Sequence, residues 1–334
     1  MRQLTFKRFL PFAVAALMIF SLGCGNTSTQ EKATDTDAVV IVTGGDTESQ
    51  SVSTGTNHSS LYSVDGTTET SNGESYASDT EDVNAVLVKS LGILTMTSAD
   101  INKTGDVTGD YTDGNNAAVA VISKGQLTLN QSNITTNGTG AVGLFVSAEG
   151  TQLAVNDTSV YTSGESSPVL IVREDASAMI TSGSLSTEGT DSACILLLGG
   201  RLTLSGVTLS SKSGDTLRVL SGDNFLTLDQ TAILAMPTLA DGTTLVLKLQ
   251  NGAAFTGELG GTLPAKASVT LDATSKLTLT AETYLTGFVN ADTTHQNIES
   301  NGFNLYYDSN APENAYLNAQ SFLLPGGGFL APII

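Results

Sequence analysis

Residues 125–164 read GQLTLNQSNITTNGTGAVGLFVSAEGTQLAVNDTSVYTSG, a stretch that contains two copies of one pattern. Each copy has a segment in which apolar residues alternate with others, LTLN at 127–130 and LAVN at 153–156. A single apolar residue follows, Ile134 or Val160, and a glycine comes four residues later in both copies. Alternation with a period of two is typical of β-strands, so the pattern predicts short strands that recur every 26 residues here.

The same pattern extends in both directions from this stretch, and three sets of anchors define it. The first set of strands comprises AVLV (85–88), AVAV (118–121), AVGL (141–144), PVLI (168–171), ACIL (193–196) and TLRV (216–219). The second set comprises LTMT (94–97), LTLN (127–130), LAVN (153–156), AMIT (178–181), LTLS (202–205) and LTLD (226–229). The third set is one apolar residue per copy: Ile101, Ile134, Val160, Leu185, Leu209 and Ile233.

Successive third anchors lie 33, 26, 25, 24 and 24 residues apart. A regular period in this range indicates one solenoid coil per repeat. Leucine-rich repeats have a similar length, but their Leu-x-x-Leu-x-Leu frame is absent here. We therefore predict an all-β fold, a single right-handed parallel β-helix with coils of about 24 residues and terminal caps. The first interval is longer because residues 105–116 (GDVTGDYTDGNN) are expected to bulge out as a loop.

In such a fold, each inward side chain packs on its equivalent one coil away. The predicted inward stacks of the first strand are Val86, Val119, Val142, Val169, Cys194 and Leu217, and Val88, Val121, Leu144, Ile171, Leu196 and Val219. Those of the second strand are Leu94, Leu127, Leu153, Ala178, Leu202 and Leu226, and Met96, Leu129, Val155, Ile180, Leu204 and Leu228. Cys194 is thus predicted to be a buried thiol that fills its stack.

Glycines recur four residues after most third anchors, and Gly214 follows its anchor at five. The four regular ones are Gly105, Gly138, Gly164 and Gly189. We expect these glycines to supply the positive φ that a corner of the coil needs.

The repeat also sets the predicted domain boundaries. Residues 85–283 form the regular helix, in which LVLKL (245–249), SVTL (268–271) and KLTLT (276–280) are further strands. Residues 38–84 are expected to form irregular N-terminal coils or a cap, with AVVIV (38–42), LYSVDG (61–66) and ESYAS (74–78) as strands. Residues 284–334 are expected to form the final coils and a cap, since an open solenoid end invites edge pairing.

The N-terminus resembles a bacterial export signal with a lipidation site. Arg2, Lys7 and Arg8 precede an apolar run that is too short for a membrane span. The run ends Ser21-Leu22-Gly23-Cys24, which resembles a lipobox apart from Ser21. We predict a signal peptide at 1–23, lipidation of Cys24, and a flexible tether at 24–37. The alternative is an ordinary signal peptide that happens to contain a cysteine. The mature chain would then be exported and anchored at the bacterial membrane.

The net charge of the chain restricts the classes of partner that it can bind. Its 33 acidic and 14 basic residues give a net charge of −19. A chain this acidic repels phosphate backbones, which argues against nucleic-acid binding. Solubility and attraction of cations account for the charge most simply.

The coil pattern strand-G-x-L-T-L-x-x-S-x-I-x-T-x-G resembles the repeats of bacterial surface β-helix proteins of the adhesin-like and pectate-lyase-like kind. The segment 277–332, from LTLTAETYL to LPGGGFLAP, is similar to the ending shared by such proteins in anaerobic and gut bacteria. This resemblance covers roughly residues 60–332 and implies the fold and a surface location. It brings no catalytic residues. Lys276-Leu277 departs from it, because relatives carry a tryptophan near this strand that could stack on a sugar.

Catalytic chemistry finds little support in the sequence. A polysaccharide lyase on this fold needs a basic residue with acidic neighbours on adjacent coils, and the arginines after residue 84 are Arg173, Arg201 and Arg218. They are not expected to stack, although Glu174 and Asp175 adjoin Arg173. A glycoside hydrolase needs two facing carboxylates, which the outward strand positions do not carry. The two histidines, His58 and His295, are far apart in sequence. We therefore expect no enzymatic activity and no cofactor.

Two outward rows are the candidate binding surfaces. On the first strand the row is Leu87, Ala120, Gly143, Leu170, Ile195 and Arg218, and on the second it is Thr95, Thr128, Ala154, Met179, Thr203 and Thr227. The apolar row is either a contact surface or a surface covered by a loop. The threonine row is either a flat ligand-binding face or ordinary solvent-facing strand. The loop residues Asp106, Asp110 and Asp113 are a candidate calcium site.

Two functions fit these features. One is an adhesive, ligand-binding or structural role at the cell surface, with a polysaccharide or a host or neighbouring cell as partner. The other is a carbohydrate-binding protein or, further from the sequence pattern, a polysaccharide lyase.

Lipidation of Cys24 is directly testable. The protein should partition with membranes and be released by a protease that cuts within 25–37. Each buried CH₂ of an acyl chain contributes about 0.8 kcal/mol, and stable anchoring needs more than one chain. Cys24→Ala should accumulate as unprocessed or mislocalised protein in fractionated cells. Normal maturation and membrane anchoring of this variant would contradict the lipoprotein prediction.

Overall fold

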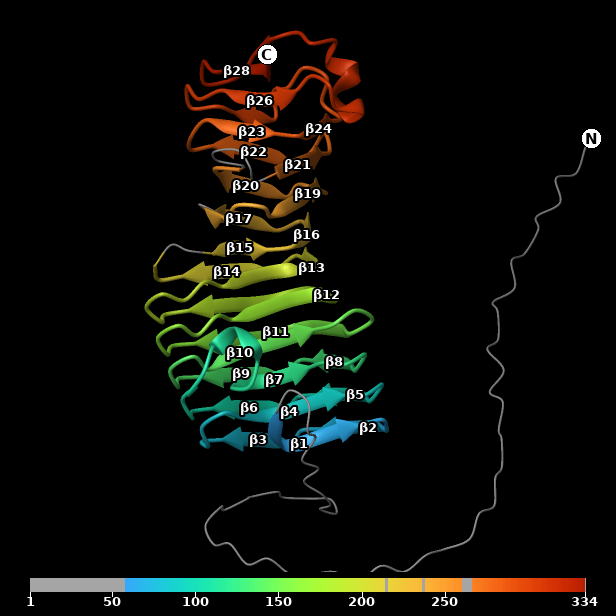
Figure 1. The fold of residues 1–334 in the computed structure, drawn as a ribbon, viewed down its shortest axis with the longest axis vertical. Coiled ribbons are helices and arrows are strands. Elements are labelled where there is room, and N and C mark those ends of the chain that lie inside the picture. Colours follow the sequence, from blue (N-terminus) through green and yellow to red (C-terminus); the bar gives the residue numbers. More distant parts are fainter. Residues whose placement is uncertain (1–57, 214–215, 236–237, 260–265, 334) are drawn as a thin grey trace, which may run out of the picture. The chain divides into compact units, whose positions relative to one another are not determined.

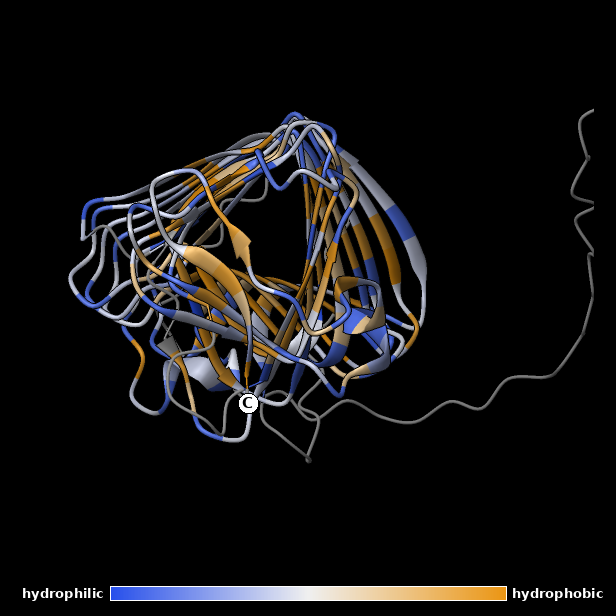
Figure 2. Cartoon of the chain, turned by 90° about the horizontal axis from the view of Figure 1, so that it is seen from above, coloured by the Kyte–Doolittle hydropathy of each residue, from blue (hydrophilic) through white to orange (hydrophobic). Residues whose placement is uncertain are grey.

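The computed structural model describes residues 58–213, 216–235, 238–259 and 266–333. They form a right-handed parallel β-solenoid of about 11 turns, with a spacing of roughly 25 residues between equivalent positions, as predicted. The coils stack along one axis (Figure 1). Seen along that axis they superpose into a triangular outline whose sides are the strands (Figure 2). The N-terminal segment 1–57, including Cys24 and AVVIV at 38–42, lies outside the described residues.

Each coil contributes one strand to each side of the triangle. The first side is built from β1 (Ser59–Asp65), β4 (Val83–Lys89), β7 (Ala117–Val121), β10 (Val142–Ser147), the start of β12 (Leu170–Thr187), the start of β13 (Ile195–Ser205), β15 (Leu217–Ser221) and β18 (Thr238–Leu239). The second side contains β2 (Thr68–Asn72), β5 (Ile93–Thr97), β8 (Gln126–Asn130), the start of β11 (Gln152–Thr162), the middle of β12, the end of β13, β16 (Asp223–Asp229), β19 (Thr244–Gln250), β21 (Lys266–Leu271) and β24 (Gly287–Asn290).

The third side begins with β3 (Ser75–Ser78), β6 (Asp100–Lys103), β9 (Asn133–Thr136), the ends of β11 and β12, and β14 (Thr208–Ser211). Two separate four-stranded sheets follow, one that continues this side and one that continues the first side. One contains β17 (Ala232–Ala235), β20 (Ala254–Gly257), β22 (Lys276–Leu279) and β25 (Ile298–Glu299). The other contains β23 (Thr283–Leu285), β26 (Leu305–Asp308), β27 (Phe322–Leu323) and β28 (Phe329–Ile333). Two short 3₁₀ helices complete the described fold, η1 (Tyr111–Asp113) and η2 (Pro312–Leu317).

The second strand of each coil has the predicted register. Leu204, for example, pairs with Ile180 in the coil before it and with Leu228 in the coil after it. All three side chains are fully buried in the main core. Alternating residues in these strands point outward and are partly or fully exposed. The predicted inward stacks of the second strand are therefore confirmed.

The register predicted for the first strand is wrong in three coils. Val119 pairs with Leu144 instead of Val142, and Leu144 pairs with Leu170. The inward stacks are therefore Val86, Val119, Leu144, Leu170, Ile195 and Leu217, and Val88, Val121, Val146, Val172, Leu197 and Val219. Leu170 and Ile195, predicted outward, belong to the main core, whereas Ile171 and Leu196 lie outside it. Segments such as AVGLFV are apolar on both faces, so alternation could not set their register.

Cys194 is buried, as predicted, but Ile195 takes its expected place in the stack. The thiol lies just before β13, where its Sγ donates to the carbonyl oxygen of Ser210 at 3.0 Å. A buried thiol in this position is a small apolar filler at a corner of the coil.

The first coil is regular, contrary to the expectation of irregular structure up to residue 84. Strands β1, β2 and β3 pair in register with β4, β5 and β6. Its inward positions nevertheless differ, because Tyr62, Glu69 and Tyr76 replace the aliphatic residues of later coils. The hydroxyl of Tyr62 donates to Glu69 Oε2 at 2.6 Å, and the two tyrosine rings lie 4.9 Å apart. The core thus ends in a polar layer.

The C-terminal end departs from the coil pattern. Strand β28 pairs with β26 in parallel and with β27 antiparallel. The helix η2 packs beside β24 and buries Leu317. Tyr307 is fully buried in this region, and its hydroxyl donates to Gln320 O at 2.8 Å. These contacts close the core at residues where a cap was expected.

The regular spacing of the corner glycines has a different cause from the one predicted. None of the four, Gly105, Gly138, Gly164 and Gly189, has a positive φ. A Cβ on Gly138 would lie 2.2 Å from the carbonyl oxygen of Gly105, and one on Gly164 would lie 1.9 Å from that of Gly138. These glycines allow adjacent coils to approach closely. Gly214 lies outside the described residues. Positive φ occurs at this corner two residues later, at Gly140, Ser166 and Asp191, and at the turn from the second to the third strand, at Ser98, Gln131, Asp157, Ser182, Gly206, Gln230 and Asn251.

Because of this close approach, substitution by alanine should destabilise the fold at one glycine and leave it unchanged at another. Gly164→Ala should lower the free energy of unfolding by about 1–3 kcal/mol, because its Cβ would collide with backbone that is shared by two coils. Gly109→Ala is the matched control, since a Cβ there meets nothing within 4 Å and φ is not positive. Urea unfolding of both variants checks the prediction. Equal midpoints would mean that the glycine column tolerates side chains.

Candidate functional site

The outer surface of the first-strand sheet carries an apolar cluster. It consists of Leu87, Ala117, Ala120, Ile122, Val142, Phe145, Ile171 and Leu196, and we call it the outer cluster. Although its side chains point away from the core, they are all buried. Tyr111 of the long loop packs against them. Of the predicted apolar row, Leu87 and Ala120 belong to this covered surface, whereas Leu170 and Ile195 lie in the main core.

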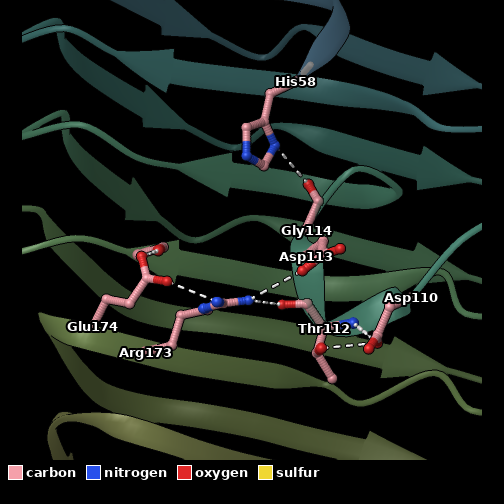
Figure 3. Close-up of polar contacts among 8 residues, drawn as sticks. His58, Asp110, Thr112, Asp113, Gly114, Arg173 and Glu174 are labelled. Carbon is pink, nitrogen blue, oxygen red and sulfur yellow. Dashed lines mark hydrogen bonds and ion pairs between the residues drawn. The ribbon is translucent and has the colours of Figure 1, made fainter. Parts of the chain in front are cut away.

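The loop at 105–116 crosses the outer cluster and is held at its end by His58 (Figure 3). Nδ1 of His58 donates to the carbonyl oxygen of Gly114 at 3.2 Å. The imidazole also lies 6.0 Å from the ring of Phe145, centroid to centroid. Gly114 has a φ of +73°, and a Cβ on it would collide with the Phe145 ring. His58 and Gly114 thus fix the loop directly over an aromatic member of the outer cluster.

Arg173 holds the same loop from a later coil (Figure 3). Its guanidinium donates to the carbonyl oxygen of Thr112 at 2.5 Å and lies 3.5 Å from Asp113 Oδ1. Glu174 accepts from the other side of the guanidinium at 2.6 Å and also accepts from the Ser147 hydroxyl. The Ser147 hydroxyl and Arg173 lower the pKa of Glu174. Arg173 is therefore a structural tie between a loop and a strand.

The three acids proposed for calcium make separate contacts. Oδ1 of Asp106 accepts from the backbone N–H of Thr139, and Asp110 accepts from the N–H of Thr112 as the cap of η1. Asp113 faces Arg173. Within the described ranges, no three His, Cys, Asp or Glu side chains lie close enough together to hold a metal ion. The structure thus does not bring the predicted ligands into one site.

The outward side chains of the second-strand sheet are partly or fully exposed along the described solenoid. These side chains form three columns across ten coils, and we call this surface the polar face. The central column is Thr70, Thr95, Thr128, Ala154, Met179, Thr203, Thr227, Lys248, Thr270 and Val289. The flanking columns include Ile93, Gln126, Gln152, Ser177, Arg201, Phe225 and Val246 on one side, and Thr97, Asn130, Asn156, Thr181, Ser205, Asp229 and Gln250 on the other.

The predicted threonine row is confirmed in its register and extended by the structure. Thr95, Thr128, Thr203 and Thr227 are all half-buried on the polar face. Met179 interrupts the row and is 53% exposed. Neighbouring side chains in the adjacent column bond to each other, as when Asn156 Nδ2 donates to Asn130 Oδ1 at 3.0 Å. The face is thus a flat array of hydroxyl and amide groups, with hydrophobic interruptions.

A shallow groove of about 350 Å³ crosses the polar face near its middle. Arg201, Phe225 and Lys248 line it, together with Thr203, Thr227, Val246 and Leu202. The Cζ atom of Arg201 lies 4.0 Å from the centre of the Phe225 ring. A guanidinium over an aromatic face is attracted by the ring quadrupole, and this fixes its orientation.

The three arginines occupy three different settings. Arg173 ties the loop, Arg201 stacks on Phe225, and Arg218 lies 2.8 Å from Asp191 Oδ1. Arg218 aligns with Leu196 on the first-strand sheet, outside the polar face. As the sequence predicted, these arginines do not stack into one row.

Several residues of these surfaces were missed by sequence reasoning. His58 is 56 residues from Gly114, and no pattern connects them. Phe225 and Lys248 were identifiable, because both are unusual at outward positions of otherwise regular strands. That Phe225 and Lys248 lie close to Arg201 depends on the register of three successive coils.

Comparisons with known proteins give no family for this chain. No protein-family model, no curated protein and no solved structure matches it. Among the residues that the structure describes, there is no helix with the length and apolarity to cross a bilayer. The parallel β-solenoid fold therefore stands on the structure itself.

The loop should loosen in acid because of His58. Burial lowers the pKa of His58 below 6.5. Asp113 raises this pKa, and Arg173 and Lys89 lower it further. The unfolded form then binds the proton more readily, so this part of the fold loses stability as pH falls below 6.5 toward the lowered pKa. Hydrogen exchange of residues 105–116, corrected for intrinsic rates, should quicken between about pH 7.5 and about pH 5.5.

His58→Phe is the control for this prediction. Phenylalanine keeps a ring against Phe145 but cannot take up a proton. The variant should show much less change in exchange across the same pH range. An unchanged pH dependence would assign the effect to the carboxylates of the loop instead.

Proposed function

We propose that this chain is a lipid-anchored protein of the bacterial surface that binds an extended ligand on its polar face without converting it. The proposal rests on the exposure of the polar face. It is open over ten coils, whereas the comparable surface of the first-strand sheet is buried under the loop at 105–116. A covered sheet contributes stability, while an open one is available for binding.

The chemistry of the polar face supports binding by many similar contacts. Threonine hydroxyls and asparagine and glutamine amides recur at the spacing between strands, about 4.8 Å. Each such group can donate and accept hydrogen bonds. A long ligand with repeated polar groups could engage several coils at once, so that weak contacts combine into useful affinity.

The arrangement of titratable groups favours binding over catalysis. An active site gathers acids and bases whose pKa values are shifted by one another in a cleft. Two groups with shifted pKa values in the described part of the chain, Lys103 and Asp272, serve structure instead. Lys103 is buried, its Nζ donates to Thr80 O at 2.8 Å, and burial lowers its pKa to about 8. Asp272 accepts hydrogen bonds from Asn251 and Thr274 that lower its pKa to about 2.

Arrays of glycans and of host surface proteins test the proposal with the full chain. Thr128→Trp would place a large side chain on the polar face, and Thr135→Trp would place it on the third-strand sheet of the same coil. Binding should fall about tenfold in the first variant and stay near the parent level in the second. Equal binding by all three proteins, or release of sugar products from a bound polysaccharide, would refute the proposal.

A further inference from the structure

The groove at Arg201, Phe225 and Lys248 differs from the rest of the polar face in its charge. The three residues belong to consecutive coils, on β13, β16 and β19. Arg201 and Lys248 are exposed, and Phe225 is half-buried. In the three columns of the polar face, the only other charged side chain that the structure describes is Asp229. Two cations thus lie close together on a nearly neutral surface of a chain with a net charge of −19.

The cations of the groove have unused hydrogen-bond donors. Neither the Arg201 guanidinium nor the Lys248 ammonium makes a hydrogen bond or an ion pair with any residue that the structure describes. Some other cations of the solenoid do have partners, as Lys89 has in Asp65 at 3.3 Å. The stacking of Arg201 on Phe225 holds the guanidinium plane and leaves its in-plane N–H groups available.

The nearby acids are already engaged. Asp223 Oδ1 accepts from the Thr244 hydroxyl at 2.7 Å. Asp229 Oδ2 accepts from Gln250 Nε2 at 2.8 Å and from Asn251 Nδ2 at 2.9 Å. The groove therefore has unused donors, and both nearby carboxylates already accept hydrogen bonds from neighbouring side chains. A ligand that matches it must supply acceptors and negative charge, and a carboxylate provides both for a guanidinium.

Apolar atoms adjoin the cations. Val246 is 39% exposed within the groove, and Met179, in the coil before Arg201, is 53% exposed. Val246 pairs with Phe225 of the adjacent coil, so the groove contains a small apolar patch beside the hydroxyls of Thr203 and Thr227. Sugar rings present the same combination, with C–H groups on a face and hydroxyls at the edge. The groove is thus suited to a sugar polymer more than to a free anion.

The separation of the two cations specifies the ligand further. Arg201 and Lys248 are two coils apart along the axis and two residues apart along the strands, a separation of about 12 Å. This is about the length of a disaccharide. We infer that the groove binds a linear acidic polysaccharide in which a carboxylate recurs on every second sugar, with its chain running diagonally from coil to coil across the polar face. The inference rests on the proposed binding function of the polar face and names its ligand class.

Binding measurements on the full chain test the inference with a defined probe. A hyaluronate octasaccharide carries a carboxylate on alternate sugars, polygalacturonate carries one on every sugar, and dextran carries none. We expect the hyaluronate oligosaccharide to bind best, with affinity that falls as salt rises. Arg201→Gln and Lys248→Gln should each weaken it about fivefold to tenfold.

Lys276→Gln is the matched control, because it removes the same charge from an exposed position on β22, in a different sheet. Its affinity should equal that of the parent. Equal weakening by Lys276→Gln would show a non-specific effect of charge and overturn the inference, as would equal or tighter binding of polygalacturonate or dextran. If hyaluronate does not bind while another ligand is lost on Thr128→Trp, the ligand class is wrong and the proposed function stands. If no ligand is sensitive to Thr128→Trp, the proposed function fails as well.

Discussion

The fold depends on one constraint, that each residue pairs with its equivalent in the next coil. Once the strands are stacked in parallel and in register, like side chains lie above like along the axis, and the core is built one column at a time. The glycine column shows how strict this requirement is, since a methyl group on Gly164 would overlap the backbone of the coil before it. Corner hydroxyls follow the same rule. Thr136 donates to Ala141 O and Thr162 to Ser167 O, at 2.8 and 2.7 Å. Extra residues are accommodated only outside the coil, as in the loop at 105–116.

Sequence alone predicted those parts of the fold in which the two faces of a strand differ. The second strand alternates apolar and polar residues, so its columns were assigned correctly, and with them the period and the fold class. The first strand is apolar on both faces, because the loop covers its outside. Phe145 and Ile171 therefore could not be distinguished from inward residues, and Leu170 and Ile195 were placed on the wrong side. Strands at 61–66 and 74–78 were predicted for the first coil, but its regularity was not, because polar residues occupy several of its inward positions.

The candidate site was predictable in outline only. The threonine row follows from the repeat, and its register held. The groove that interrupts it depends on one residue from each of three coils, which no local pattern connects. The candidate calcium site illustrates the opposite case. Asp106, Asp110 and Asp113 are close in sequence, yet each serves a different backbone or side-chain group in the loop. Proximity along the chain was therefore a poor guide to a shared site, whereas spacing by whole coils was a good one.

The polar layer of the first coil limits how solenoids of this kind can grow. A further parallel coil, from this chain or from a second molecule, would have to cover Tyr62, Glu69 and Tyr76. Covering them would remove water from the Glu69 carboxylate, which now accepts from the Tyr62 hydroxyl at 2.6 Å and the Thr67 hydroxyl at 3.1 Å. Burying a carboxylate without a cation to compensate it costs several kcal/mol. Exposed strand edges otherwise favour polymerisation into fibres. A single charged residue in the first described coil thus opposes head-to-tail association of two solenoids at this end.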